Sequence, residues 1–338
     1  MATWDLNRFV KTLAYFGTIP IVSSIDWLQH LLGSRPDPTV HFNFTNMTVI
    51  LLIGANSSIG QQVMLLLQQA GYAVRTSSSG DAETIDSDVS AIVCCTDADH
   101  DQPSIDTAQV RTSQRLFDFR QPSTEIGEVW GALDDVVMGG VSQSSLTFAS
   151  ASALFSGVVS IDNSGGFASV RTRNFEPAID LSDFTGIELR VKGDGARYKF
   201  MLRSETRWDG IAYCASFDTI ANEWTTITIP FTDLIPVFRA KTVREAGAID
   251  ASQVRSMQLM LSKFEYDGAL NPHFTPGFFQ LQVESIAAYC FKTPLILVSS
   301  TGIVLPDSSP GAIALRLKEV IKEIPAYRLS ANQPFYDQ

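Results

Sequence analysis

The chain has 338 residues, of which 45% are hydrophobic and 18% charged, and its formal net charge is −11. This length suits one large or two modest domains. The acidic balance argues against a protein that binds nucleic acid backbones, which requires a basic surface. We therefore expect no direct contact with nucleic acid. None of the four cysteines forms a Cys-x-x-Cys pair, so we expect buried thiols in a reducing compartment.

Residues 1–38 predict an apolar N-terminal helical segment. Four residues interrupt the apolar run from Trp4 to Leu32, so it is too broken to span a bilayer: Lys11, Gly17, Pro20 and Asp26. Helical spacing of the apolar residues predicts two short helices on either side of Gly17–Pro20. Two interpretations stay open. The helices pack on the body of the protein, or residues 4–32 contact a membrane surface or a partner through Trp4 and Trp27.

Residues 47–105 have the pattern of a shortened dinucleotide-binding half. An apolar run, Thr48–Ile53, is typical of a buried parallel strand and leads into the glycine turn GANSSIG. A helical stripe follows and ends at Gly71. Two further strands are expected at Tyr72–Thr76 and Ala91–Thr96. A glycine turn at a helix N-terminus offers backbone N–H groups to a phosphate.

This turn resembles the GATGGVG turn of extended and atypical short-chain dehydrogenases. Gly54 and Gly60 match its first and last glycine, and Ser57 stands at the middle one. Arg75 lies where such proteins contact the adenosine ribose or its phosphate, which would suit NADP better than NAD. The candidate cofactor-binding residues are therefore Gly54, Ser57, Gly60 and Arg75. An inherited scaffold without a cofactor is the interpretation we expect, with NADP binding as the alternative.

The sequence pattern changes in residues 115–291, which predict an antiparallel β-sandwich of the jelly-roll kind. Runs that alternate apolar and polar residues recur about every dozen residues, separated by turn residues. The expected strands are Leu146–Phe148, Ala153–Ser160, Ala168–Arg173, Gly186–Lys192, Tyr198–Ser204, Ile211–Phe217, Thr225–Pro230, Ser256–Leu261 and Phe278–Ala288. Trp208, Tyr213 and Trp224 are candidates for lining a ligand-binding face, although aromatic residues of sandwiches are more often core.

The densest motif of the chain is Trp130–Ser144, WGALDDVVMGGVSQS. Its glycine pair permits a turn with positive φ. The two acids are expected to cap the amides of that turn, or arginines of a neighbouring strand such as Arg171 and Arg173. A catalytic acid pair would need a raised pKa on one member, for which the sequence gives no reason. The candidate partner-binding residues are Trp130, Asp134, Asp135, Met138, Gly139, Gly140 and Ser142.

The segment FDFRQPSTEIGEVWGALDDVVMGGVSQSSL resembles the start of the complex I intermediate-associated protein domain. Three later segments also fit that family: SGVVSIDNSGGFASVRTR, FTGIELRVKGDGARYKFMLR and WTTITIPFTDLIPVFRA. The family includes a mitochondrial assembly factor for respiratory complex I. The resemblance covers about half the chain and implies a galactose-binding-like sandwich whose relatives act in assembly or biogenesis.

Residues 293–330 predict a return to the shortened nucleotide-binding domain. A buried strand is expected at Pro294–Ser300, a helix at Pro310–Glu323 and a last strand at Ala326–Leu329. PLILVSSTG resembles the strand that carries the active-site serine of short-chain dehydrogenases. Neither later tyrosine is followed four residues on by a lysine, so the Tyr-x-x-x-Lys proton-transfer machinery is missing. We therefore expect no enzyme.

The layout predicts a reduced Rossmann-like parallel sheet, residues 47–105 and 293–330, interrupted by a jelly-roll sandwich, residues 115–291. It resembles a group of cyanobacterial and plastid proteins with the same sandwich inserted in an atypical short-chain dehydrogenase domain. The opening RFVKTLAYFGTIPIVSSIDWLQHLLGS also resembles cyanobacterial members. A plastid member supports translation of a photosystem II reaction-centre subunit.

These patterns favour a non-enzymatic assembly or biogenesis factor for a membrane-bound photosynthetic or respiratory complex, such as a photosystem or a complex I-like dehydrogenase. Its partners would be subunits or intermediates of that complex. We expect it on the cytoplasmic side, attached peripherally to the thylakoid or plasma membrane. The alternative is an NADP-binding redox sensor or oxidoreductase, and a carbohydrate-binding module stays open by fold analogy. The four histidines lack metal-ligand spacing, so no metal is expected.

Overall fold

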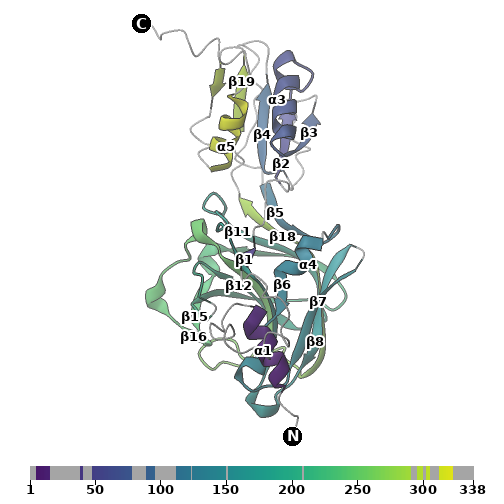
Figure 1. The fold of residues 1–338 in the computed structure, drawn as a ribbon, viewed down its shortest axis with the longest axis vertical. Coiled ribbons are helices and arrows are strands. Elements are labelled where there is room, and N and C mark those ends of the chain that lie inside the picture. The colour runs from purple at the N-terminus through teal and green to yellow at the C-terminus, as the bar shows by residue number, and fades with distance from the viewer. Residues whose placement is uncertain are drawn as a thin grey trace, which may run out of the picture. The chain divides into compact units, whose positions relative to one another are not determined.

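The computed structural model describes residues 5–15, 39–40, 48–77, 89–95, 112–122, 124–149, 151–207, 209–290, 295–299, 302–304 and 312–322. The chain forms two compact units (Figure 1). The first comprises Met1–Phe42, Phe117–Ser182 and Gly186–Ile286, and the second Asn43–Leu116, Asp183–Thr185 and Ala287–Gln338.

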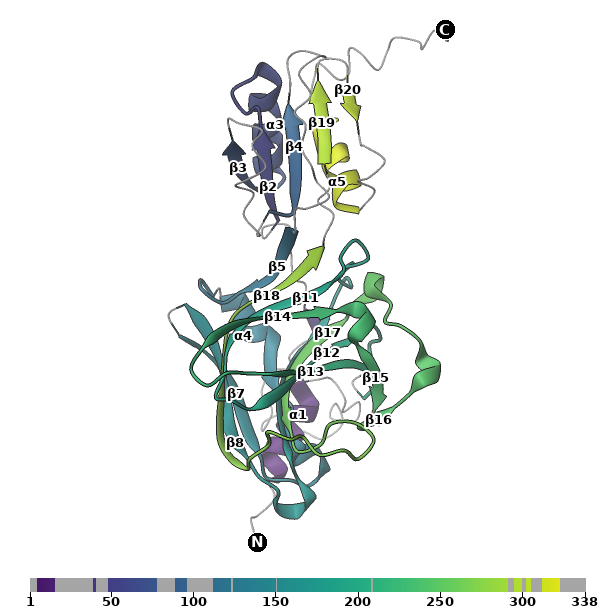
Figure 2. The ribbon, with the colours of Figure 1, turned by 180° about the vertical axis from the view of Figure 1, so that it is seen from behind.

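The first unit is built on two large, mainly antiparallel sheets (Figure 2). The first sheet has the strand order β14-β11-β18-β8-β7, with β5 also paired to β18. Its strands are β5 (Thr112–Asp118), β7 (Gln143–Ala149), β8 (Ser152–Val159), β11 (Gly186–Lys192), β14 (Trp224–Pro230) and β18 (Gly277–Cys290). The second has the order β16-β15-β13-β12-β17-β9-β6. Its strands are β6 (Trp130–Ala132), β9 (Phe167–Thr172), β12 (Arg197–Arg203), β13 (Ala212–Asp218), β15 (Ile235–Phe238), β16 (Lys241–Thr242) and β17 (Ser256–Ser262).

Alternation of side chains explains how these strands form a core between the sheets. In β11, Ile187, Leu189 and Val191 are fully buried and the residues between them are not. The rings of Phe155 and Phe279 meet edge to face with their centroids 5.0 Å apart. The predicted antiparallel sandwich is therefore confirmed, and most predicted strands lie within two residues of the observed ones.

Several short elements of this unit connect or cover the strands. They are α1 (Leu6–Tyr15), β1 (Thr39–Val40), α4 (Thr124–Val129), β10 (Asn174–Phe175) and the 3₁₀ turns η5 (Asp135–Met138), η6 (Asp162–Ser164), η7 (Phe231–Asp233), η8 (Arg244–Ala246) and η9 (Ala251–Gln253). β1 pairs in parallel with β10. Helix α1 is the first of the two predicted N-terminal helices, and it packs against the turn η5 and strand β6. The second predicted helix, with Trp27, and also Trp4, lie outside the described residues.

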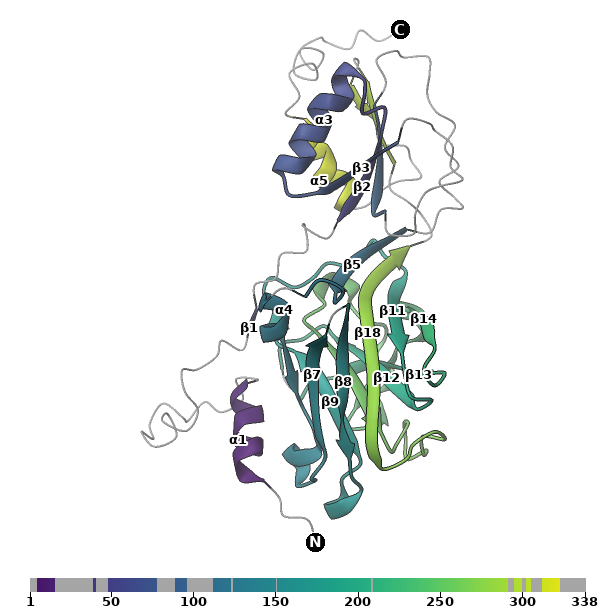
Figure 3. The same cartoon turned by 90° about the vertical axis from the view of Figure 1, so that its right-hand side faces the viewer.

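The second unit contains a mainly parallel sheet in the order β20-β19-β4-β2-β3. Its strands are β2 (Val49–Ile53), β3 (Ala73–Ser77), β4 (Ala91–Cys95), β19 (Leu295–Ser299) and β20 (Gly302–Val304), and only β20 pairs antiparallel. Helices α3 (Ser58–Gln69) and α5 (Ala312–Ile321) lie on the same side of this sheet (Figure 3). β19 follows the sandwich in sequence and pairs with β4, which precedes it.

Burial in this unit follows the patterns seen in the sequence. All five residues of β4 are buried, as expected for a strand covered on both faces. Val63 and Leu67 of α3 are fully buried, as are Leu317 and Ile321 of α5. The strand predicted at Ala326–Leu329 lies outside the described residues. Among the helices of the described part of the chain, none has the length and apolarity needed to cross a membrane.

Candidate functional site

The Asp-Asp-Val-Val-Met-Gly-Gly motif folds into a single 3₁₀ turn, η5, between strands β6 and β7. Asp134 precedes the turn with extended backbone, and Gly139 ends it in the left-handed region at φ 92°. The Leu133 N–H donates to the Ser169 carbonyl at 2.8 Å, which anchors the entry of the turn to β9. The turn thereby places two adjacent carboxylates beneath the surface, each only 1% exposed.

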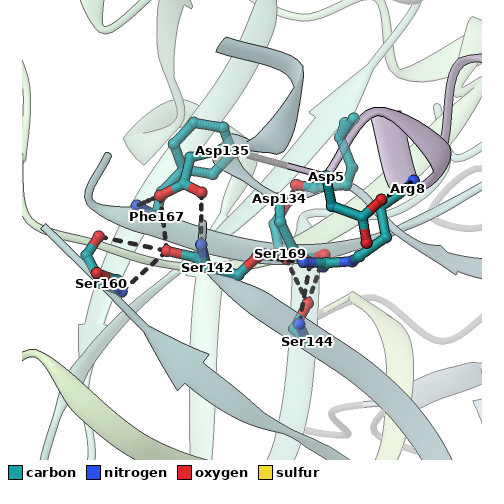
Figure 4. A network of polar contacts seen from close by, with 10 residues as sticks. Asp5, Arg8, Asp134, Asp135, Ser142, Ser144, Ser160, Phe167 and Ser169 are labelled. Atoms are coloured by element: carbon teal, nitrogen blue, oxygen red, sulfur yellow. Dashed lines mark hydrogen bonds and ion pairs between the residues drawn. The ribbon is translucent and has the colours of Figure 1, made fainter. Parts of the chain in front are cut away.

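The Asp135 carboxylate joins the turn to two other segments of the sandwich (Figure 4). Its Oδ1 accepts from the Ser142 N–H at 2.9 Å, and its Oδ2 accepts from the Ser142 hydroxyl at 2.6 Å. The same Oδ2 accepts from the amides of Gly166 and Phe167 at 2.8 and 3.3 Å. The Ser142 hydroxyl also accepts from the Ser160 N–H at 2.9 Å. One carboxylate therefore fixes the starts of β7 and β9 and the end of β8.

The neighbouring Asp134 carboxylate binds β7, β9 and helix α1 (Figure 4). It accepts from the Ser144 N–H at 2.9 Å, the Ser144 hydroxyl at 2.5 Å and the Ser169 N–H at 3.0 Å. The Arg8 guanidinium of α1 donates to its Oδ2 at 3.0 Å and to the Ser142 carbonyl at 3.1 Å. The N-terminal helix thus completes the coordination of a buried acid, and Asp5 in turn caps the Arg8 N–H at 3.1 Å.

All four oxygen atoms of the two carboxylates accept hydrogen bonds from within the protein, and this limits the chemistry that the site can perform. Burial, the largest effect, raises the pKa of Asp134 above its usual value, while hydrogen bonds from Ser144 and Ser169 and the charge of Arg8 oppose that rise. A raised pKa would suit a general acid, but such a group must also reach a substrate. Neither carboxylate presents an oxygen to solvent, so the arrangement suits a structural clasp rather than proton transfer.

The acids accept from backbone amides, but these amides belong to segments that follow the turn or lie on β9, and Asp134 makes no side-chain cap to η5. The predicted capping of the turn's own amides is therefore wrong, and so are the predicted arginines. The guanidinium at Asp134 belongs to Arg8, and neither acid is hydrogen-bonded to Arg171 or Arg173. Arg173 instead lies over the ring of Tyr15 at 4.5 Å from its centroid. Arg171 is buried on β9, where burial holds its pKa well below the usual value.

The other motif residues have distinct positions. Trp130 is core, edge to face with Phe117 at 5.3 Å. An added Cβ at Gly140 would lie 2.3 Å from the Asp135 Cγ, so the close approach of these two residues requires glycine. Met138 points outward and is 78% exposed. The structure therefore brings Asp134, Asp135, Gly140 and Ser142 into one network and leaves Met138 free for other contacts.

Sequence reasoning missed several residues of this network, which are not among the candidates named from the sequence. They are Arg8, Ser144, Ser169 and the amides of Gly166 and Phe167. Ser144 had a signal, because it follows Ser142 at the two-residue spacing that puts both side chains on one face of a strand. Arg8 had none, since it lies 126 residues from Asp134.

The candidate cofactor-binding residues all lie in the second unit, three of them at the turn between β2 and α3 and Arg75 on β3. Gly54 has a positive φ of 76° and Ser57 caps α3. The Ser57 hydroxyl donates to the Gly54 carbonyl at 2.8 Å and accepts from the Gly60 N–H at 2.9 Å. A side chain of the protein thus occupies an amide that a phosphate would need. Arg75 is exposed on β3.

Other candidate groups in the described part of the chain give no second site. The four cysteines are buried thiols, as predicted, and no cluster of three metal-ligating side chains is found within the described ranges. Tyr213 is buried in the seven-stranded sheet and Trp224 lies in the other sheet, so the two do not share a ligand-binding face. Trp208 lies outside the described residues.

Comparison with solved structures finds weak similarity to carbohydrate-binding modules. The family 11 module of a cellulosomal cellulase of Clostridium thermocellum aligns with a TM-score of 0.40 and 19% identity, covering 54% of this chain and 95% of the module. A family 29 module from Piromyces equi aligns at a TM-score of 0.24 and 12% identity, covering 53% of this chain and 90% of the module. These low scores carry no inference about a ligand.

Comparison of the sequence gives a more specific result. An uncharacterized protein of Schizosaccharomyces pombe is 30% identical over 162 residues, which covers 43% of this chain and 74% of that protein. The family profile described as complex I intermediate-associated protein 30 (CIA30) matches residues 117–283, and these contain the two-aspartate turn and most strands of the sandwich. Through these residues the chain belongs to the CIA30 family.

Proposed function

We propose that the protein is a non-enzymatic assembly factor whose sandwich binds subunits or intermediates of a membrane-bound energy-converting complex. One observation carries this proposal: the family motif uses both of its acids for internal hydrogen bonds, which leaves the outer surface of the sandwich for its activity. Family membership supports a role in complex assembly. Protein–protein contact is the activity that a rigid scaffold without an exposed acid pair fits best.

We propose a photosystem or a complex I-like dehydrogenase as the complex assisted. The support is the resemblance in layout to the cyanobacterial and plastid group, together with the N-terminal stretch that resembles cyanobacterial members. A peripheral position on the cytoplasmic face of a thylakoid or plasma membrane follows from this proposal. Residues 4–32 would supply membrane contact only in part, because α1 packs on the sandwich through Arg8 and Tyr15.

A gentle-detergent pull-down of the tagged protein from its native membranes tests the proposal. We expect early subunits of one photosynthetic or respiratory complex to be enriched over an untagged control. A deletion of residues 1–38 and the single variant Arg8→Gln run in parallel, so that loss of the segment is distinguished from loss of one ion pair. Recovery of the protein without any subunit of a membrane complex would contradict the proposal.

NADP binding remains the second candidate, since the glycine turn between β2 and α3 is followed by Arg75 on the next strand. The Ser57 side chain opposes it by occupying the Gly60 amide. Titration with NADPH, followed by its fluorescence, decides between the two. We expect no saturable binding to the wild-type chain, and micromolar binding that is lost in Arg75→Ala would favour a redox sensor or oxidoreductase.

A further inference from the structure

The exposed large apolar side chains of the sandwich unit gather at one end of its strands. Eight of them in the described residues are between 39% and 78% exposed: Leu6, Met138, Val158, Ile161, Ile220, Phe264, Leu270 and Phe278. We call this set the apolar end. Scattered apolar residues on a surface need no explanation, but a group on neighbouring turns marks an interaction site.

Strand pairing and hydrogen bonds place the first members side by side. Phe278 lies directly opposite Val158 in the ladder between β18 and β8. Ile161 follows the last residue of β8 by two positions. The Ser160 N–H next to it donates to Ser142, which is bonded to Asp135 of η5. That turn carries Met138, so these four residues belong to segments joined by strand pairing and hydrogen bonds.

The remaining members join the same end through other contacts. Phe264 and Leu270 form a bridge with each other, and the neighbouring Lys263 N–H donates to the Gly166 carbonyl at 2.7 Å. Ile220 follows Asp218, which forms an ion pair with Arg197 at 2.6 Å. Arg197 also pairs with Glu265, beside Phe264. Leu6 lies two residues before Arg8, which binds the Ser142 carbonyl.

The opposite end of the strands has a different surface. It is formed by the described residues of the segments 149–152, 173–182 and 204–211. None of the eight apolar side chains lies there, and the charged side chain of Arg207 is 67% exposed. The exposed apolar side chains therefore lie away from that end of the sandwich unit.

The charges around the apolar end indicate the chemistry of its partner. Four exposed acidic residues lie on or beside its segments: Asp5, Asp162, Asp218 and Glu223. The nearby cations are already engaged, since Arg197 pairs with two acids and the Lys263 ammonium lies 5.0 Å from the centre of the Phe264 ring. An acidic rim repels anionic lipid headgroups and attracts lysine and arginine.

We propose that the apolar end binds a protein segment in which apolar residues are flanked by lysines or arginines. This inference deepens the proposed function, because it names the surface and the kind of subunit segment that the assembly factor would hold. Met138 and Phe278 are the anchors we expect, since they are its most exposed members and a partner would bury the most apolar surface on them.

Site-specific photo-crosslinking in native membranes tests the surface. A benzoylphenylalanine is placed at Met138 or at Phe278, and the control position is Arg207, which is similarly exposed at the opposite end. We expect about tenfold more adducts from the first two positions, on peptides that are apolar and basic. Adducts equal to those at Arg207, or on acidic peptides or lipid, would overturn the proposal.

A double variant, Met138→Ser with Phe278→Ser, provides the second measurement. We expect it to keep the thermal stability of the wild type, because both side chains are exposed, and to recover about tenfold less of the bound subunits. Flotation with vesicles of phosphatidylcholine, alone or with phosphatidylglycerol, should show no binding by either protein. Vesicle binding that the double variant loses would identify a membrane site instead.

The outcomes separate this inference from the proposed function. If the wild type recovers complex subunits and the double variant recovers equal amounts, the apolar end is not the binding surface and the assembly role stands. If no complex subunit is recovered, but crosslinks from positions 138 and 278 reach basic, apolar segments of another protein, the surface is right and the assembly role fails.

Discussion

Adjacent aspartates in the family motif have different roles, although both are buried. Asp135 accepts from donors of β7 and β9 only, whereas Asp134 also accepts from Arg8 of α1. The first therefore stabilises the sandwich itself and the second couples it to the N-terminal helix. A substitution at each position should have a different consequence.

Replacing Asp135 by asparagine should destabilise the sandwich by roughly 3 kcal/mol. The substitution turns one carboxylate oxygen into an NH₂ group, which cannot accept a hydrogen bond, so the buried donors that bind this oxygen lose their acceptor. The measurement is urea unfolding, followed by exchange protection of peptides covering residues 133–144 and 160–170. The matched control is Asp162→Asn on the exposed turn η6, which should change the free energy of unfolding by less than about 0.5 kcal/mol. An equal loss of unfolding free energy in the two variants would refute the structural role of the Asp135 hydrogen bonds.

The two glycines after the turn should differ in their tolerance of alanine. Gly139 has a positive φ but open space around its Cα, so Gly139→Ala should cost about 1 kcal/mol of backbone strain. Gly140→Ala should cost more than twice as much, since its Cβ would collide with the Asp135 carboxylate. Thermal unfolding of both variants gives the order, and a smaller loss at Gly140 would contradict the packing described.

At the scale of single residues, the sequence predicts which side chains form hydrogen bonds better than it predicts the residues to which they bind. The pair of acids next to a glycine pair correctly predicted a turn and acids that bind amides, but the local rule pointed to the amides of the turn itself, whereas most of the donors come from β7 and from residues 166–169. Arg8 was not predictable, since nothing in the local pattern relates it to a residue 126 positions away. In the sequence, Ser57 stands at the middle glycine of the dehydrogenase turn, and in the structure it is the N-cap of α3.

In the described part of the chain, the side chains of Arg8 and Tyr15 bind helix α1 to the sandwich, and docking of the helix should depend on them. The helix has no buried residue, and an isolated ten-residue helix is marginal in water. Its docking relies on Arg8, on the stacking of Tyr15 with Arg173, and on the Tyr15 hydroxyl, which donates to the Glu128 carbonyl at 3.0 Å. Removing one of these should release the helix while the sandwich stays folded.

Arg8→Gln should abolish the exchange protection of residues 5–15 without altering that of β11 or β18. In the wild type the protection should also be lost in acid, because docking favours the ionised form of Asp134 and lowers its pKa relative to the undocked state. Burial raises this pKa, so the loss begins above the usual range of an aspartate. Exchange of this helix that is independent of pH would contradict the ion pair.

The strands of the sandwich differ in how accurately they can be predicted from their sequences. Gly186–Lys192 was predicted to the residue because its apolar positions alternate and one face is buried. β5 and β15 were missed, since TSQRLFD and IPVF lack that alternation. The sequence marks η5 as a motif but not as a helical turn, because four residues are too few to show a helical period.

On the scale of the whole chain, the two units should unfold as separate transitions. Each has its own buried core, the sandwich around Phe155 and Phe279 and the parallel sheet around Ile92 and Leu67. Calorimetry should resolve two transitions. Asp135→Asn should lower only one, whereas Ser57→Ala, which removes the cap of α3, should lower only the other, by about 1 kcal/mol. A shift of both transitions by either variant would show one cooperative unit.

The separation of Arg8 from Asp134 also has a consequence for synthesis of the protein. At roughly 5–20 residues per second, the ribosome adds Asp134 about 6–25 seconds after Arg8. Throughout that interval helix α1 lacks the carboxylate that Arg8 binds in the folded protein, and it is available to other contacts near the ribosomal exit tunnel. We therefore expect α1 to dock only after β7, β8 and β9 have been made and have folded around the two aspartates.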